Sequence, residues 1–309
     1  MILSTAFTLL YKLVPLYILI LLGYLAGRYL AVDKKSVALL AIYIVTPVVI
    51  FYGVSETAID LSSVLLPLII FVISSVICIC LKYFSMNTLG MKQLSGMIGF
   101  ASASGNTGYF GIPVAIIIFG EDILGLAALC VLGSVLFENT LGVYTAASGK
   151  YSSKEAIQKV LKLPSLYGFL AGLCVNIYGI EFSENITTLF DKFVGTYTIL
   201  GMMIIGLGLS EIKRASFDLI FTTITALAHF VLWPLLMFLV LYLDRVSFSY
   251  INEQQSLILL LLSIVPIAAN TVAWATVFEI DPDKVAVSVL LTTLLAAIYI
   301  PIFVSIFVL

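Results

Sequence analysis

Residues 102–113, SASGNTGYFGIP, and residues 263–276, SIVPIAANTVAWAT, are the two stretches on which the fold depends. Each lies inside an apolar run long enough to cross a bilayer, yet each carries helix breakers and amides where a regular span carries leucine and valine. Backbone in hydrocarbon must satisfy its own hydrogen bonds, so a broken helix is tolerated only where protein or a watery cavity surrounds it. We therefore expect two interrupted helices, one in each half of the chain, beside a shared cavity.

The composition around these stretches is that of an integral membrane protein. Of the 309 residues, 62% are apolar and only 10% are charged, whereas soluble domains carry about 25% charged residues. Ten runs approach the roughly 20 apolar residues that a helical span requires, and the short connections between them leave no room for a soluble domain. The predicted spans are residues 8–30, 36–54, 62–85, 93–119, 122–147, 163–182, 188–210, 216–243, 255–279 and 284–308.

The distribution of basic residues predicts how the chain is oriented. If the N-terminus lies outside, only Lys12, Lys192 and Arg245 of the 15 Lys and Arg residues fall on the outer side, and the remaining twelve lie on the inner connections. Cytoplasmic loops carry such an excess of Lys and Arg. We expect a multi-pass protein of the cell (plasma) membrane with both termini on the non-cytoplasmic side, in contact with lipid and with no nucleic-acid partner.

The ten predicted spans divide into two halves of five. Residues 1–147 form the first half, residues 148–162 a short basic cytoplasmic loop, and residues 163–309 the second half. Pro15 precedes Gly23 by eight residues, and Pro164 precedes Gly172 by the same step. Because an odd number of spans per half places the halves in opposite orientations, a repeat here must be an inverted one.

The two breaks carry the chemistry expected of a binding site for an anion. A half-helix that starts within the membrane presents unpaired amides and the positive end of its dipole. Such an end attracts an anion without a buried cation, and no Lys or Arg lies at mid-depth in this chain. The candidate binding residues are Gly105, Asn106, Thr107 and Pro113 at the first break, and Pro266, Asn270 and Thr271 at the second.

Three further polar residues within the spans leave alternatives open. Thr46 precedes Pro47 and either belongs to a simple proline kink or faces the cavity. Glu138 is a carboxyl within a span, which suits coupling to H⁺ or Na⁺ as well as structural pairing. His229, the only histidine, is either a polar group bonded between helices or a proton relay. The four cysteines read as apolar filler; we expect no metal site and no cofactor.

Four segments resemble the auxin efflux carrier family, which includes plant auxin exporters and bacterial malate or malonate permeases. They are GNTGYFGIPVA (105–115), SIVPIAANTVAWATVFEIDPDKVAVSVLLTTL (263–294), YIVTPVVIF (43–51) and IIGLGLSEI (204–212). The likeness covers nearly the whole chain. The short loop between the halves, and Pro266 together with Asn270, are similar to bacterial members rather than to plant exporters.

The resemblance implies an all-α fold of ten transmembrane helices in two inverted five-helix repeats, with the fourth and ninth helices broken and crossing. Spans 1, 2, 6 and 7 would form a scaffold, and spans 3–5 and 8–10 a transport domain that carries the substrate by an elevator-type motion. Asn106 and Asn270 would face the substrate. The resemblance also implies a possible homodimer through the scaffold.

These observations favour a secondary active or facilitative transporter of a small organic anion, most plausibly a carboxylate. One alternative is a sodium- or proton-coupled symporter or exchanger of the bile-acid-transporter type that uses Glu138 and His229. Another is a membrane sensor that binds a ligand without transporting it. An intramembrane enzyme is not expected, because the spans hold no paired aspartates, HExxH motif or Ser/His set.

Overall fold

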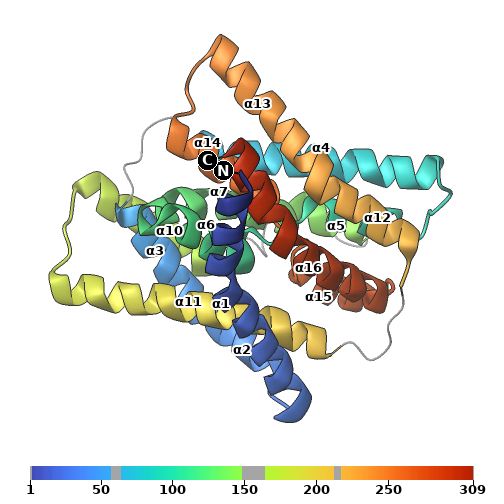
Figure 1. Ribbon diagram of the computed structural model, residues 1–309, viewed down its shortest axis with the longest axis horizontal. Helices are drawn as coiled ribbons and strands as arrows, with labels where there is room; N and C mark the ends of the chain where they lie inside the picture. The colour runs from blue at the N-terminus through green and yellow to red at the C-terminus, as the bar shows by residue number, and fades with distance from the viewer. Residues whose placement is uncertain (1, 57–63, 148–163, 212–216, 309) are drawn as a thin grey trace.

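A computed structural model describes residues 2–56, 64–147, 164–211 and 217–308 (Figure 1). Within these ranges every regular element is helical, and one isolated antiparallel bridge pairs Gly105 with Ile267. The basic loop expected at residues 148–162 lies outside the described residues. The all-α class predicted from the sequence is therefore confirmed for the described part of the chain.

The first half of the chain holds one uninterrupted helix after another until the first break. Short π turns (wide helical turns, labelled η) join several helices end to end. The elements are α1 (Ile2–Tyr29), α2 (Lys34–Leu40), η1 (Ala41–Val45), α3 (Thr46–Glu56), α4 (Leu65–Asn87), α5 (Ser95–Ala103), η2 (Thr107–Gly111), α6 (Ile112–Phe119), the 3₁₀ turn η3 (Glu121–Ile123), α7 (Leu124–Phe137), η4 (Glu138–Gly142) and α8 (Val143–Ala146).

The second half follows the same plan, with its break between α14 and α15. Its elements are α10 (Pro164–Tyr178), α11 (Glu184–Ser210), α12 (Leu219–Leu227), η5 (Ala228–Leu232), α13 (Trp233–Ser247), α14 (Glu253–Leu262), α15 (Asn270–Phe278) and α16 (Pro282–Phe307).

Seven continuous helices of the described chain are long and apolar enough to cross a membrane. They are Ala6–Tyr29, Lys34–Glu56, Leu65–Asn87, Glu121–Ala146, Glu184–Ser210, Leu219–Ser247 and Pro282–Phe307. The two interrupted helices fall short because each half is shorter than a bilayer is thick; their apolar pieces are Thr107–Phe119 and Glu253–Leu262. The chain is therefore a multi-pass membrane protein.

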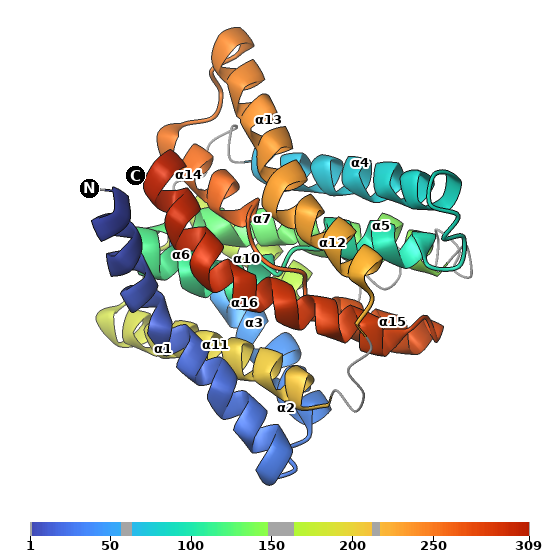
Figure 2. The ribbon, with the colours of Figure 1, turned by 45° about the vertical axis from the view of Figure 1, so that its right-hand side comes forward.

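Glycine allows α1 and α11, and likewise α10 and α3, to touch backbone to backbone. We call α1, α2, η1, α3, α10 and α11 the scaffold group. A Cβ atom on Gly206 of α11 would fall on the Ile20 carbonyl oxygen of α1, and one on Gly168 of α10 on the Pro47 carbonyl oxygen of α3. Small residues commonly mediate such close packing between membrane helices. In Figures 1 and 2, α1 crosses α11, against which it packs, while α4–α8 and α12–α16 make up the rest of the described molecule.

Three of the π turns have a shared local cause, which is a proline two residues after the turn ends. Pro47, Pro113 and Pro234 follow η1, η2 and η5 in this way. Proline has no N–H, and its ring clashes with the carbonyl four residues earlier, so the helix widens there. The Phe230 carbonyl, four residues before Pro234, accepts a hydrogen bond from the Tyr299 hydroxyl instead. The fourth turn, η4, has no proline within the two residues that follow it.

Candidate functional site

The two interrupted segments lie against each other and pair through their backbones. The Asn106 N–H donates to the Pro266 carbonyl at 2.8 Å, and the Ala268 N–H donates to the Ser104 carbonyl at 2.8 Å. These two bonds form the antiparallel bridge, and they satisfy polar groups that the end of α5 and the start of α15 would otherwise leave unpaired. Each break therefore depends on the other for its hydrogen bonds.

Side chains from the helix α12–η5–α13 satisfy the carbonyls at the end of α5. His229 Nε2 lies 2.9 Å from the Ala101 carbonyl oxygen, and the Trp233 Nε1–H donates to the Ser102 carbonyl at 3.1 Å. His229 and Trp233 are four residues apart and so lie on one face of their helix. The His229 ring is 1% exposed and also meets the Val265 backbone in the second break. The His229 ring thus contacts the backbone of both breaks.

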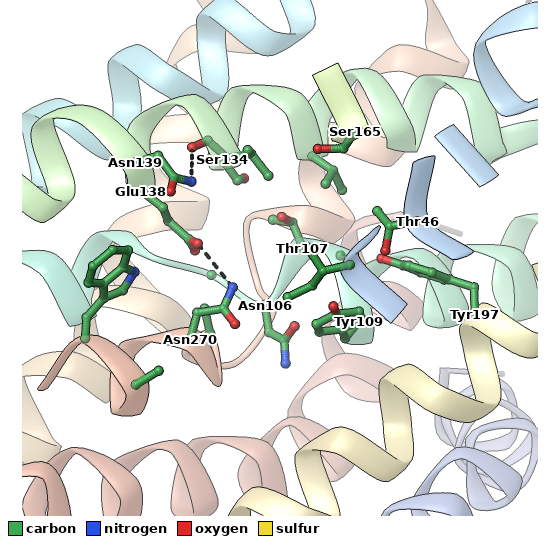
Figure 3. Close-up of a pocket in the computed structure, with 18 residues that line it drawn as sticks. Thr46, Asn106, Thr107, Tyr109, Ser134, Glu138, Asn139, Ser165, Tyr197 and Asn270 are labelled. Carbon is green, nitrogen blue, oxygen red and sulfur yellow. Dashed lines mark hydrogen bonds between the residues drawn. The ribbon is translucent and has the colours of Figure 1, made fainter. Parts of the chain in front are cut away.

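Beside the bridge lies a cavity of about 310 Å³ (Figure 3), a size typical of small-molecule sites. Its walls come from both parts of the molecule. The scaffold group contributes Ile42, Thr46, Ser165 and Tyr197, whereas the other helices contribute Gly105–Tyr109, Val131, Ser134, Val135, Glu138, Asn139, Ala268, Asn270, Ala273 and Trp274. A molecule held here would touch both parts of the protein.

Two helix starts face this cavity. At the first, the Thr107 N–H bonds to the Gly105 carbonyl and the Gly111 N–H to the Asn106 carbonyl, both at 2.8 Å. The backbone N–H groups of the residues between Thr107 and Gly111 belong to the first helical turn, and the first N–H groups of a helix have no carbonyl partner within it. At the second, α15 begins at Asn270, which lies on the cavity wall. The positive ends of two helix dipoles therefore meet at one place.

Asn106 supplies a donor that the protein itself does not use. The residue is 5% exposed, and its Nδ2 has no hydrogen-bond partner among the described residues. A buried donor without a partner costs about 1–3 kcal/mol, so a ligand that accepts from it regains that free energy. None of the described residues that line the cavity is Lys, Arg or His.

A carboxyl group shares this wall with the amides. Asn270 is exposed to the cavity, and its Nδ2 lies 3.5 Å from Glu138 Oε2 (Figure 3). The neighbouring Asn139 turns its own Nδ2 to the Val135 carbonyl at 2.9 Å. The site thus combines donors suited to an anion with one acidic side chain.

The residues proposed from the sequence divide into two sets. Gly105, Asn106, Thr107, Asn270, Thr46 and Glu138 line the cavity. Pro113, Pro266, Thr271 and His229 do not; they shape or support the breaks instead, as when the Thr271 hydroxyl donates to the Ala268 carbonyl at 2.6 Å. The half-helix that follows the first break begins at Thr107, because the π turn η2 precedes α6.

Several further polar residues of the wall are not among these candidates: Tyr109, Ser134, Asn139, Ser165, Tyr197 and Trp274. Tyr109 and Trp274 belong to the two stretches quoted above, so their positions carried some signal. Tyr197 lies on α11, whose regular apolar pattern indicates only packing. The close approach of its hydroxyl to Gly108, 3.0 Å from where a Cβ atom would stand, is visible only in the structure.

Comparison with known proteins agrees with this geometry. The model of the family described as membrane transport protein matches residues 8–161. An uncharacterized transporter of Methanocaldococcus jannaschii is 28% identical over 289 residues, covering 89% of this chain and 91% of that protein. A protein of Rhizobium meliloti, named provisionally as a malonate transporter, is 26% identical over 306 residues, covering 91% and 90%. Residues 8–161 thus match the membrane transport protein family, and the relatives named as transporters cover 89% and 91% of the chain, in agreement with the resemblance to auxin efflux carriers.

Proposed function

We propose that this protein moves a small organic anion, a carboxylate, across the membrane without altering it chemically, and that the cavity beside the two breaks is the binding site. The observation that carries the proposal is the buried, unpartnered Asn106 Nδ2 between two helix starts. Helix starts and amide donors attract a carboxylate, and the cavity wall offers no basic side chain that would fix the anion permanently. The relative named for malonate supports a carboxylate substrate.

The packing of the scaffold group supports two inverted repeats. If the first five spans correspond to the last five, span 1 matches span 6 and span 2 matches span 7. The contact of span 1 with span 7 then has its counterpart in the contact of span 6 with span 2. Both pairs are present as α1 with α11 and α10 with α3. The proposal includes α10 and the two broken helices as the remaining three of ten spans.

The position of the cavity supports an elevator-type motion. Its walls divide between the scaffold group and the other helices, and both breaks belong to the latter. In the proposed motion, α4–α8 and α12–α16 carry Asn106, Asn270 and the bound anion past Thr46 and Tyr197 of the scaffold group. The inner location of most basic residues supports a plasma-membrane protein with both termini outside.

The test is uptake of radiolabelled malonate into liposomes that contain the purified protein. N106A and N270A each remove an amide from the cavity wall, and we expect either to reduce uptake at least tenfold, because one lost bond to a charged ligand is worth about 1.5–3 kcal/mol. N87A, which removes an exposed asparagine at the end of α4, is the matched control and should transport as the wild type does.

Normal uptake by both N106A and N270A would refute the site. A wild-type protein that binds malonate, seen as a thermal shift, but produces no flux would favour the sensor instead. Screening other dicarboxylates and indole acids by thermal shift identifies a better substrate if malonate gives no response.

A further inference from the structure

We propose that Glu138 is a proton-binding site that couples anion movement to proton movement, with Asn270 as the donor that it captures and releases. This rests on the proposed function, because it requires that the cavity hold an anion. Neither the family match nor the relatives' names assign a coupling ion.

The backbone conformation at Glu138 directs its side chain toward the cavity. Glu138 is the first residue of η4, the π turn that no following proline explains. Isolated π turns often occur at functional sites. The widened turn lets Glu138 and the adjacent Asn139 both reach the cavity wall, although neighbours on a regular helix are about 100° apart.

Glu138 has no cation to balance its charge. The residue is 6% exposed and forms no ion pair among the described residues. Within the described chain its side chain accepts a hydrogen bond from the Asn270 amide, a long contact at 3.5 Å. An ionised carboxylate this poorly paired is costly within a membrane, and a neutral carboxyl group is not.

The other titratable groups around η4 do not supply that charge. The elements packed against it are α4, α5, α7 and α8, with α15 against α8. Their Lys, Cys and Tyr side chains, together with the tyrosine of η2 that faces the cavity, are Cys78, Cys80, Lys82, Tyr83, Tyr109, Cys130 and Tyr144. Of these side chains only Tyr109 also lines the cavity, and it is not a cation. The proposal therefore links protonation of Glu138 to the charge of the ligand and not to that of a neighbouring cation.

Anion binding and protonation of Glu138 then favour each other. A carboxylate ligand and an ionised Glu138 in one cavity of about 310 Å³ repel each other. When a proton from the adjoining water binds a Glu138 oxygen, the repulsion ends and the Asn270 Nδ2–H is released to the ligand. The carboxyl O–H becomes a second donor. On the opposite side of the membrane the anion leaves, the proton returns to water, and Asn270 bonds to the carboxylate again.

The test uses Glu138→Gln, which imitates the protonated side chain in shape and charge. Liposomes with wild-type protein or E138Q are given malonate, an inward pH gradient of one unit, and a membrane potential clamped to zero. One coupled proton sustains up to a tenfold difference in concentration for one pH unit. We expect wild-type protein to approach tenfold more accumulation than E138Q. E138Q should still exchange internal for external labelled malonate.

The matched control is E121Q, because Glu121 lies in η3 and lines a different cavity, with Glu56 and Gln255. It should accumulate malonate as the wild type does. No exchange by the wild-type protein would contradict the proposed function itself. Exchange without any response of the wild type to the gradient, equal accumulation by E138Q, or accumulation driven only by an inward Na⁺ gradient would overturn the proton site alone.

A second measurement tests the proposal if E138Q folds poorly. Titration calorimetry of wild-type protein with malonate, in buffers of different ionisation enthalpy, counts the protons taken up on binding. Between pH 6 and 9 the count for the wild type should exceed that for Glu138→Ala or E138Q, neither of which has a carboxyl group at this position, by up to one proton at some pH. Identical counts across this range would overturn the proposal.

Discussion

Replacing His229 with phenylalanine tests whether this histidine holds the break together or relays protons. The substitution keeps an aromatic ring but removes the nitrogen that lies 2.9 Å from the Ala101 carbonyl oxygen. Both residues are buried, at 1% and 0% exposed. Leaving a buried carbonyl unpaired costs about 1–3 kcal/mol. For a chain of this length each kcal/mol lowers the melting temperature by roughly 2 °C, so we expect H229F to melt roughly 2–6 °C below the wild type.

The assay is thermal unfolding of the detergent-purified protein, followed by intrinsic fluorescence and by size exclusion after heating. H229Q restores an N–H donor and should recover part of the loss. V231A changes a residue of the same π turn that is 45% exposed, and it should stay within about 1 °C of the wild type. Proton-driven accumulation by H229F should persist. A variant with unchanged melting temperature but no response to a pH gradient would show that the structural reading is wrong.

Two further predictions concern the bridge and the ion pair between Asp218 and Lys284. A Cβ atom on Gly105 would stand 2.9 Å from Val265 Cγ2. We therefore expect G105A to lose about 1–3 kcal/mol of stability, and the added substitution V265A to restore part of it. A double variant no more stable than G105A would contradict this. At Asp218, burial raises the pKa, but the Phe221 N–H and the Lys284 ammonium outweigh it and hold the pKa below its ordinary value. This contribution is present at neutral pH and disappears as the pH falls through the folded-state pKa. D218N should therefore be less stable than the wild type at pH 7, by up to about 1 kcal/mol of unfolding free energy, and the difference should shrink as the pH falls through the folded-state pKa of Asp218. A difference that stays constant with pH would contradict the ion pair.

The interruptions could be predicted from the sequence because their causes are local. Proline, glycine and amide side chains that stand close together, as around Gly105 and Pro266, disfavour a regular helix, and an amide within hydrocarbon requires a partner or a cavity. The same residues carry the resemblance to a transport family that the comparisons bear out. Local residue patterns therefore predicted where each helix is interrupted and which amide side chains lie at the interruption.

The remaining features depend on contacts between distant segments. Nothing in the sequence near His229 indicates that its ring reaches Ala101, 128 positions earlier in the chain. Nothing in the regular pattern of α11 indicates that Tyr197 reaches the cavity. The π turn at Glu138 is not followed by a proline from which it could have been predicted. Each arises from packing that no single segment encodes, and for this reason the division between cavity residues and supporting residues required the structure.

The most direct test of the account is a cryo-electron microscopy map of the protein saturated with malonate. We predict ligand density between the start of η2 and the start of α15, within hydrogen-bonding distance of Asn106 Nδ2 and Asn270 Nδ2. Density elsewhere, for instance in the separate cavity beside Glu56 and Gln255, with the space between the two breaks empty, would contradict the central claim.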